Sequence, residues 1–215
     1  MSEAHPGVSR LVCLRHAESE NVIARQAGAL PSAPLTSRGR QQASAAAAAL
    51  SAGETRLASS VYASDAVRAR QTAEVIAAAL GLRVTVLPGL SEVAMGSAEG
   101  ATDPAVLRQT ADVLKAWVVD GDLGPRVADG ESGYDVAARV TSALTQIAAG
   151  CDGRSAIVVG HVASLTVGVS ELCRNGPSLW GLPLPHAAPF PLTRGKAGWH
   201  ADWPGTREPL SGERR

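Results

Sequence analysis

The sequence has little that would bring it to a membrane or to nucleic acid. Its 20 basic and 20 acidic side chains cancel, so no net charge attracts a polyanion. No stretch approaches the roughly 18 consecutive apolar residues that a membrane-spanning helix needs. The opening MSEAHPGVSR has no apolar signal core. We therefore expect a soluble cytoplasmic protein with neither a nucleic-acid nor a membrane partner.

Cysteine is also scarce. Cys13, Cys151 and Cys173 are widely spaced and include no Cys-x-x-Cys pair, which argues against a disulfide framework and against a structural zinc site. His-Cys or paired-carboxylate spacings typical of a metal centre are missing as well. We expect three reduced thiols, and a protein that needs neither metal nor cofactor.

What is present indicates an ordinary globular chain. Its 215 residues are 45% hydrophobic, which suits one sizeable domain better than two very small ones. We expect a single domain over residues 1–215, with flexible ends at about 1–9 and 205–215.

Strand-like and helix-like segments alternate along the chain. Short apolar runs predict strands at residues 11–14, 57–64, 82–87 and 154–161. Helix patterns occupy the segments between and after these strands. Four helices are expected between a cap residue and an end: Thr36 to Gly53, Ser64 or Asp65 to Gly81, Asp103 to about Val119, and Ser132 to Gly150. A further helix is expected over residues 162–176. The tail predicts a hairpin turning at residues 194–196. This order predicts an α/β three-layer sandwich: a mainly parallel central sheet flanked by helices, with a C-terminal hairpin.

Residues suited to phosphate follow three of the four predicted strands. Arg15 and His16 follow the first strand, Ser64 with Arg68 the second, and His161 the fourth. Each one alone could be a surface cation or a hydrogen-bonded core histidine. Together they predict a site, because ligands of open α/β sheets bind beyond the carboxyl ends of the strands.

The chemistry of these side chains points to phosphoryl transfer. A guanidinium offers paired N–H groups to phosphate oxygens and keeps its charge at physiological pH. A neutral imidazole is a nucleophile, and a second imidazole, if protonated, could bind the equatorial oxygens of the transition state. Such a site needs no metal.

The segments that carry these residues resemble a known family. LRHAESEN resembles the Arg-His-Gly-x-Thr-x-x-Asn signature of the histidine phosphatase superfamily, the phosphoglycerate mutase-like proteins. Five further segments are similar to family elements and run in family order to about residue 168: PLTSRGRQQA, VYASDAVRARQTAEVI, LSEVAMGSAEG, GES at 130–132, and VVGHVASL.

The resemblance implies a role for each matching residue. His16 would be the nucleophile that becomes phosphohistidine, and Glu92 the general acid that protonates the leaving oxygen. The phosphate pocket would be completed by Arg15, Arg68 and His161, with Asn21 and Ser19 as smaller polar contacts. It implies a phosphoric monoester hydrolase of the histidine acid phosphatase type, acting on a small phosphorylated metabolite.

The chain departs from the family pattern in places that bear on the substrate. Ala17 replaces the usual glycine, and Ala27 and Pro31 lie in an altered loop that borders the site. Ala98 stands where an aromatic residue is common, which predicts a roomier wall. We expect the tail tryptophans to serve packing rather than ligand binding.

Two other functions stay open. The same residues serve cofactor-dependent phosphoglycerate mutases, and a non-catalytic member could bind a phosphorylated ligand without turnover. Hydrolysis is favoured because the segment between Glu92 and the GES motif is too short for extensive covering structure. A general acid would also be of no use to a mere binder. Neither the substrate nor the oligomeric state, for which a homodimer is one option, follows from the sequence.

Overall fold

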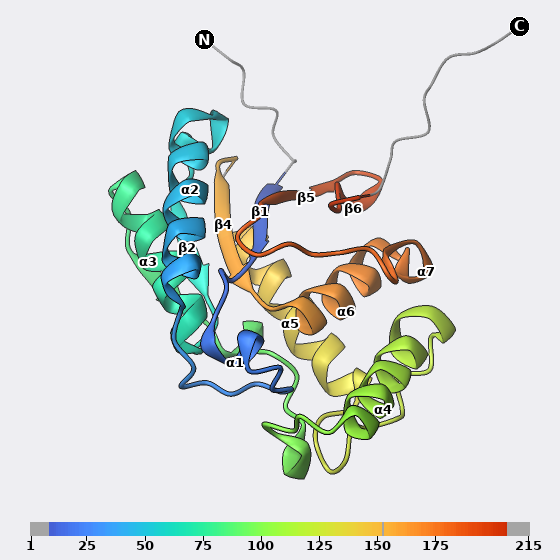
Figure 1. The fold of residues 1–215 in the computed structure, drawn as a ribbon. Coiled ribbons are helices and arrows are strands. Elements are labelled where there is room, and N and C mark those ends of the chain that lie inside the picture. Colours follow the sequence, from blue (N-terminus) through green and yellow to red (C-terminus); the bar gives the residue numbers. More distant parts are fainter. Residues whose placement is uncertain (1–8, 152, 206–215) are drawn as a thin grey trace, which may run out of the picture.

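The computed structural model describes residues 9–151 and 153–205, which are arranged around a six-stranded sheet (Figure 1). The strands are β1 (Ser9–Arg15), β2 (Ser60–Ala63), β3 (Val84–Val86), β4 (Ser155–Gly160), β5 (Phe190–Gly195) and β6 (Gly198–Ala201). Their order is β3-β2-β4-β1-β5-β6. The first four are parallel to one another, whereas β5 and β6 form an antiparallel hairpin beside β1.

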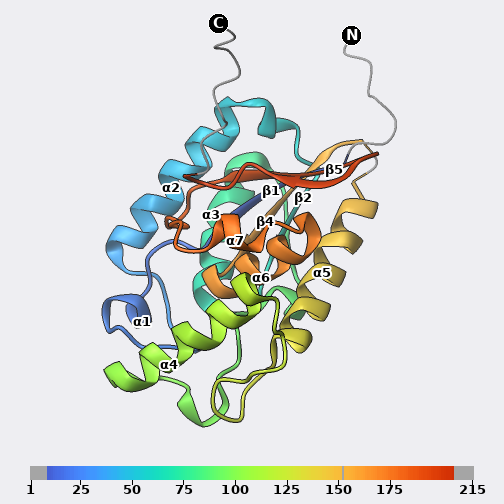
Figure 2. The ribbon, with the colours of Figure 1, turned by 90° about the vertical axis from the view of Figure 1, so that its right-hand side faces the viewer.

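Helices cover both faces of this sheet. They are α1 (Glu20–Ile23), α2 (Ser37–Ala52), α3 (Val67–Leu80), α4 (Pro104–Lys115), α5 (Gly133–Ala149), α6 (Val162–Cys173) and α7 (Gly176–Leu179). Helices α2 and α3 pack together on one face, and α5 and α6 on the other (Figures 1 and 2). This confirms the predicted three-layer α/β sandwich with a mainly parallel sheet and a C-terminal hairpin.

The strand pleat explains how one short apolar run serves two cores. Leu11 and Cys13 of β1 point to the core shared with α5 and α6. Val12 and Leu14 point to the core shared with α3. A strand segment buried on both faces is apolar throughout, as this one is from Leu11 to Leu14.

Most helix starts agree with the sequence. Thr36, Asp103 and Ser132 are N-caps whose side chains accept backbone N–H groups. The predicted cap of α3 is wrong, since Ala66 holds that position. The two residues expected there have other partners: Ser64 bonds His161, and Asp65 accepts the hydroxyl of Ser91.

Two further differences concern short features. Helices α1 and α7, of four residues each, were not predicted, because one turn shows no periodicity. The hairpin turns at Lys196 and Ala197, slightly later than expected. A π-helical turn, Ala116–Asp120, extends α4 to about the predicted end.

The chain ends stay largely untested. Of the expected flexible stretches, only Ser9, which begins β1, and Gly205 fall within the described residues. The single-domain organisation therefore stays a prediction. No helix in the described part of the chain is both long and apolar enough to cross a membrane.

Topology places the functional end of the sheet. The chain passes from β1 through α2 to β2 and β3, then returns by α5 to β4, which pairs with β1. The connections thus change direction at the carboxyl ends of β1 and β4, the usual ligand position in such sheets. Arg15 closes β1, and His161 follows β4 directly. Helices α1 and α4 lie beyond this end (Figure 1).

Candidate active site

His16 is a buried imidazole whose contacts fix its tautomer. Its Nδ1 lies 2.7 Å from the carbonyl oxygen of Ala17, which can only accept, so Nδ1 carries the proton. Nε2 accepts a hydrogen bond from Nε of Arg68 at 3.2 Å. Burial lowers the pKa of His16 well below 6.5, and the nearby His161 and Arg68 add to the shift. The ring is therefore neutral, and its Nε2 lone pair can act as a nucleophile once Arg68 turns its donor to a phosphate group.

Arg68 connects the parts of the site. Besides His16, its guanidinium donates to Nδ1 of His161 at 3.2 Å. It also donates to the carbonyl oxygens of Ala29 and Leu30, at 2.7 Å each. We expected a free fork for phosphate, whereas here the guanidinium is shared among protein acceptors. A phosphate group would have to take over its bonds to the two imidazoles.

His161 is fully buried and held on both ring nitrogens. Its Nδ1 accepts from Arg68, so the proton lies on Nε2, 2.6 Å from the hydroxyl of Ser64. Burial lowers the pKa of His161 well below 6.5, and the charges of Arg68, Arg15 and Arg139 lower it further. The second imidazole is thus neutral in this structure, and the protonated form considered from the sequence is disfavoured.

Arg15, the last residue of β1, lines the cavity and has one buried donor without a partner among the described residues. Its Nη1 donates to the carbonyl oxygen of Leu184 at 3.4 Å. Its Nε is buried and has no hydrogen-bond partner among the described residues. Burial lowers the pKa of this guanidinium below its ordinary value. An unpaired buried donor costs about 1–3 kcal/mol, and an anion in the site would remove that cost.

Glu92 joins the site through the start of α6. Its carboxylate accepts the backbone N–H groups of Ala163 at 3.2 Å and Ser164 at 2.8 Å, together with that of Val93 at 3.0 Å. Because α6 begins directly after His161, these bonds hold the carboxylate near that histidine.

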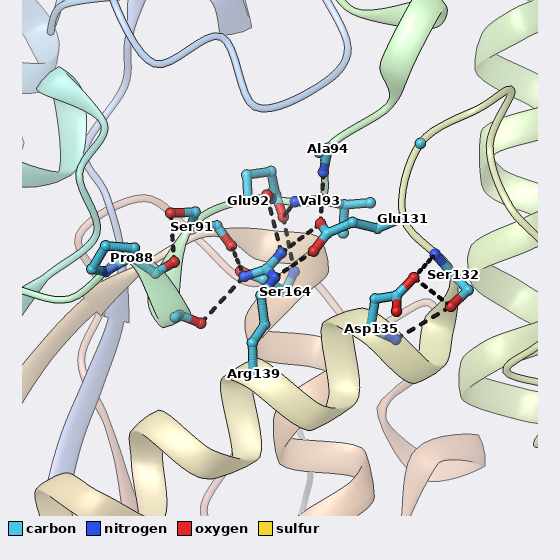
Figure 3. A network of polar contacts seen from close by, with 12 residues as sticks. Pro88, Ser91, Glu92, Val93, Ala94, Glu131, Ser132, Asp135, Arg139 and Ser164 are labelled. Atoms are coloured by element: carbon cyan, nitrogen blue, oxygen red, sulfur yellow. Dashed lines mark hydrogen bonds and ion pairs between the residues drawn. The ribbon is translucent and has the colours of Figure 1, made fainter.

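An ion pair behind Glu92 holds its loop in place (Figure 3). Arg139 of α5 forms two bonds, 2.7 and 2.9 Å long, to the carboxylate of Glu131. The same guanidinium donates to the carbonyl oxygens of Ser91 at 2.7 Å and Glu92 at 3.1 Å. Glu131 in turn accepts the backbone N–H of Ala94 at 2.9 Å.

The GES motif therefore has a structural explanation. Glu131 anchors the Glu92 loop, and Ser132 caps α5 through the N–H of Asp135. A side chain at Gly130 would collide with the carbonyl of Ala94. The sequence predicted the cap role of Ser132 but no role for Gly130 or Glu131, and nothing in it pointed to Arg139, the partner of Glu131.

Five of the seven predicted site residues line one cavity: Arg15, His16, Asn21, Arg68 and Glu92. His161 reaches this group through Arg68. Ser19 is buried beneath it and donates its hydroxyl to Oδ1 of Asn21 at 2.8 Å. Their roles in catalysis stay predictions. Ala27 lines the cavity, whereas Ala98, expected to widen it, is not among the lining residues.

His186 lies next to the site, and no sequence pattern pointed to it. Its Nδ1 donates to the carbonyl oxygen of His16 at 2.9 Å, and the two rings lie 5.6 Å apart. The residues around it, PHAAPF, match no motif. Within residues 9–151 and 153–205, no three His, Cys, Asp or Glu residues are grouped as metal ligands, and the metal-free site stays a prediction.

Comparison with known proteins decides the family. Residues 11–204 match the histidine phosphatase superfamily (branch 1). The chain belongs to the histidine phosphatase superfamily. This confirms the resemblance drawn from the motifs around His16 and His161.

Members of the superfamily similar to this chain carry different names. Glucosyl-3-phosphoglycerate phosphatase of Mycobacterium tuberculosis is 33% identical over 186 residues, which cover 80% of this chain and 81% of that protein. A probable phosphoglycerate mutase GpmB of Proteus mirabilis is 33% identical over 153 residues, 71% of this chain and 69% of that one. The structure of a mycobacterial glucosyl-3-phosphoglycerate phosphatase with VO3 superposes with a TM-score of 0.76 at 26% identity, covering 93% of this chain and 100% of that chain.

Proposed function

We propose that this protein is a phosphatase that hydrolyses a small phosphomonoester through a phosphohistidine at His16, without a metal ion. The observation that carries the proposal is the state of His16. It is neutral, its proton is on Nδ1, and its Nε2 faces Arg68 in a cavity that Arg15 also lines. A nucleophile and two cations at one point suit attack on a phosphoryl group.

The reaction would run in two balanced steps. Nε2 of His16 forms a bond to phosphorus while the ester P–O bond breaks, and its electron pair passes to the alcohol oxygen, which takes a proton from Glu92. Water then attacks the phosphohistidine, gives its proton back to Glu92, and releases inorganic phosphate. Arg15 and Arg68 balance the charge of the phosphoryl oxygens throughout.

Phosphoglycerate mutase activity is the second candidate, favoured by the names of relatives such as the Proteus mirabilis protein. A mutase must shield its phosphohistidine from water while the intermediate reorients. Here the covering helix between Glu92 and Glu131 is α4, and none of its 12 residues, all of them described, is buried. This loose cover supports hydrolysis.

The test compares the parent protein with His16→Ala. The parent should release phosphate from small phosphomonoesters and acquire an acid-labile, base-stable phosphate label, and His16→Ala should lose both. His200→Ala is the matched control, because His200 is exposed and pairs with Asp202. A fully active His16→Ala protein would overturn the mechanism, and loss of activity in EDTA with recovery on adding zinc or magnesium would overturn the metal-free site.

The same preparation separates hydrolysis from transfer. With 3-phosphoglycerate and 2,3-bisphosphoglycerate supplied, we expect little 2-phosphoglycerate. Conversion that far exceeds phosphate release would make the protein a mutase and leave His16 as nucleophile. If labelling and turnover both fail for the parent on every ester tried, the protein is a binder without catalysis.

A further inference from the structure

The wall of the cavity combines the predicted site residues with a mainly apolar lining. The cavity has a volume of about 200 Å³. Besides Arg15, His16, Arg68 and Glu92, most of its lining residues are apolar, and they come from four separate parts of the chain: Val22, Ala27, Val93, Met95, Leu114 and Val162. Polar groups there are few and uncharged: Asn21, Gln26 and Thr110. The leaving group of a substrate would therefore meet hydrocarbon.

Every charged side chain that lines the cavity already has a part in the proposed reaction. Among the lining residues of the described chain, Arg15, Arg68 and Glu92 carry charge. Both arginines lie beside His16, where the phosphoryl group must bind. No lining cation among the described residues is left for a second anionic group on the substrate. An unpaired carboxylate held against the apolar wall would lose its hydration without compensation.

Part of the apolar wall is uncovered in the free protein. Val162, the first residue of α6, keeps 36% of its surface exposed at the mouth of the cavity. Leu114 of α4 also lines the cavity, and it is half-buried because it packs against the core. A ligand with a carbon skeleton would cover the exposed surface of Val162 and the part of Leu114 that the core leaves open, and removing such surface from water favours binding.

We infer that the substrate is the phosphate ester of a small, uncharged alcohol whose carbon skeleton packs against Val93, Met95, Leu114 and Val162. The inference rests on the proposed phosphatase function and narrows it. The cavity is smaller than the roughly 300–1,000 Å³ of pockets for drug-sized ligands, which agrees with a small leaving group. The inferred substrate differs from phosphoglycerate-type esters, because those esters carry a carboxylate.

A matched pair of substrates tests the inference on the unmodified protein. n-Butyl phosphate and 4-phosphooxybutanoate have the same number of carbons and differ in a terminal carboxylate. We expect kcat/KM to be at least about tenfold higher for n-butyl phosphate. Equal or higher kcat/KM for the carboxylate ester would overturn the inference, while the proposed function would stand. If the protein released no phosphate from either ester or from p-nitrophenyl phosphate, and if His16 acquired no phosphoryl label, both the inference and the proposed function would be overturned.

Neighbouring positions on α4 offer a second test. Thr110 lines the cavity, whereas Gln109 is exposed beside it and does not. Thr110→Arg places a cation in the cavity, and Gln109→Arg adds the same charge to the same helix outside it. Thr110→Arg should shift the kcat/KM ratio toward the carboxylate ester by about tenfold, the effect of one close charge pair. Gln109→Arg should leave the ratio unchanged. An equal shift in both variants would contradict a role for the cavity wall.

Discussion

The contacts of Glu92 leave room for the proton that its proposed role requires. Its carboxylate accepts three backbone N–H groups, two of them from the first turn of α6. One oxygen accepts the N–H groups of Val93 and Ser164, whereas the other accepts only that of Ala163. A carboxyl oxygen has two lone pairs, so this second oxygen could hold a proton and keep its bond to Ala163.

The acid role predicts a dependence on the leaving group. Glu92→Gln keeps an oxygen for the N–H groups of α6 but has no proton to give. Its kcat/KM for an alkyl phosphate should fall by about 100-fold or more, the usual range for general acid catalysis. With p-nitrophenyl phosphate, whose leaving group needs little protonation, the loss should be much smaller. Steady-state kinetics on the two esters measure the difference.

Two other carboxylates serve as controls. Glu99 accepts the N–H of Met95 at 2.7 Å, and Glu18 accepts the hydroxyl of Thr36 at 2.8 Å. Neither is among the residues that line the cavity. Glu99→Gln and Glu18→Gln should therefore treat both esters alike. If Glu92→Gln lost activity equally on both esters, and Glu99→Gln or Glu18→Gln lost more on the alkyl phosphate, then Glu99 or Glu18 would be the acid.

Some of the site was readable from the sequence and some was not, for a physical reason. Arg15, His16 and His161 follow strands whose apolar runs are local signals, and the sheet brings strand ends together. The partners of Arg68 and His16 are different. The carbonyls of Ala29 and Leu30 belong to an irregular loop, and His186 lies in the tail. Backbone acceptors have no residue type, so no sequence pattern marks them.

At the scale of elements, the loop that carries Glu92 depends on α5. Arg139 holds its carbonyl groups and is itself oriented by Glu131 (Figure 3). We expect Arg139→Ala to lower kcat for alkyl phosphates on the order of 100-fold, as a shift of about 1 Å in a catalytic group can. The loss should be smaller with p-nitrophenyl phosphate, because the loop positions the acid and not the nucleophile.

Arg70→Ala is the control for this variant, since Arg70 is an exposed arginine of α3. It should leave both activities unchanged. Arg139→Lys should recover little, because an ammonium cannot form the two parallel bonds to Glu131. Equal losses on both esters would show that Arg139 maintains the fold and does not position Glu92.

The helices show the same division between local and distant signals. Thr36, Asp103 and Ser132 mark their helices because a cap bonds the backbone two or three residues away. Ser64 has the right side chain for a cap, but its hydroxyl binds His161, 97 residues further on. A functional contact of that length overrides the local preference.

For the whole molecule, the buried histidines predict how stability varies with pH. His16 and His161 have folded pKa values well below 6.5, but in the unfolded chain they titrate near 6.5. Below that pH the unfolded chain binds more protons, so the free energy of unfolding falls as pH falls. Each histidine contributes at most about 1.4 kcal/mol per pH unit.

Urea unfolding at pH 7.5, 6.5 and 5.5 would measure this slope. The double variant His16→Asn/His161→Asn should lose much of it, and what is left comes from other groups. His200→Asn should keep the parental slope, because His200 is exposed. A double variant with an unchanged slope would contradict the neutral state of the two buried rings.

The position of β1 has a consequence for how the protein is made. β1 is the first of the six described strands to be synthesised, yet it lies between β4 and β5. The bonds from Arg15 to Leu184 and from His186 to His16 join residues 169 and 170 positions apart. A nascent chain on the ribosome can therefore pair β1 with β4 first, but the other edge of this apolar strand stays open until β5 has emerged. Folding dominated by such distant pairings is slow, and an open apolar edge can pair with another chain in the meantime.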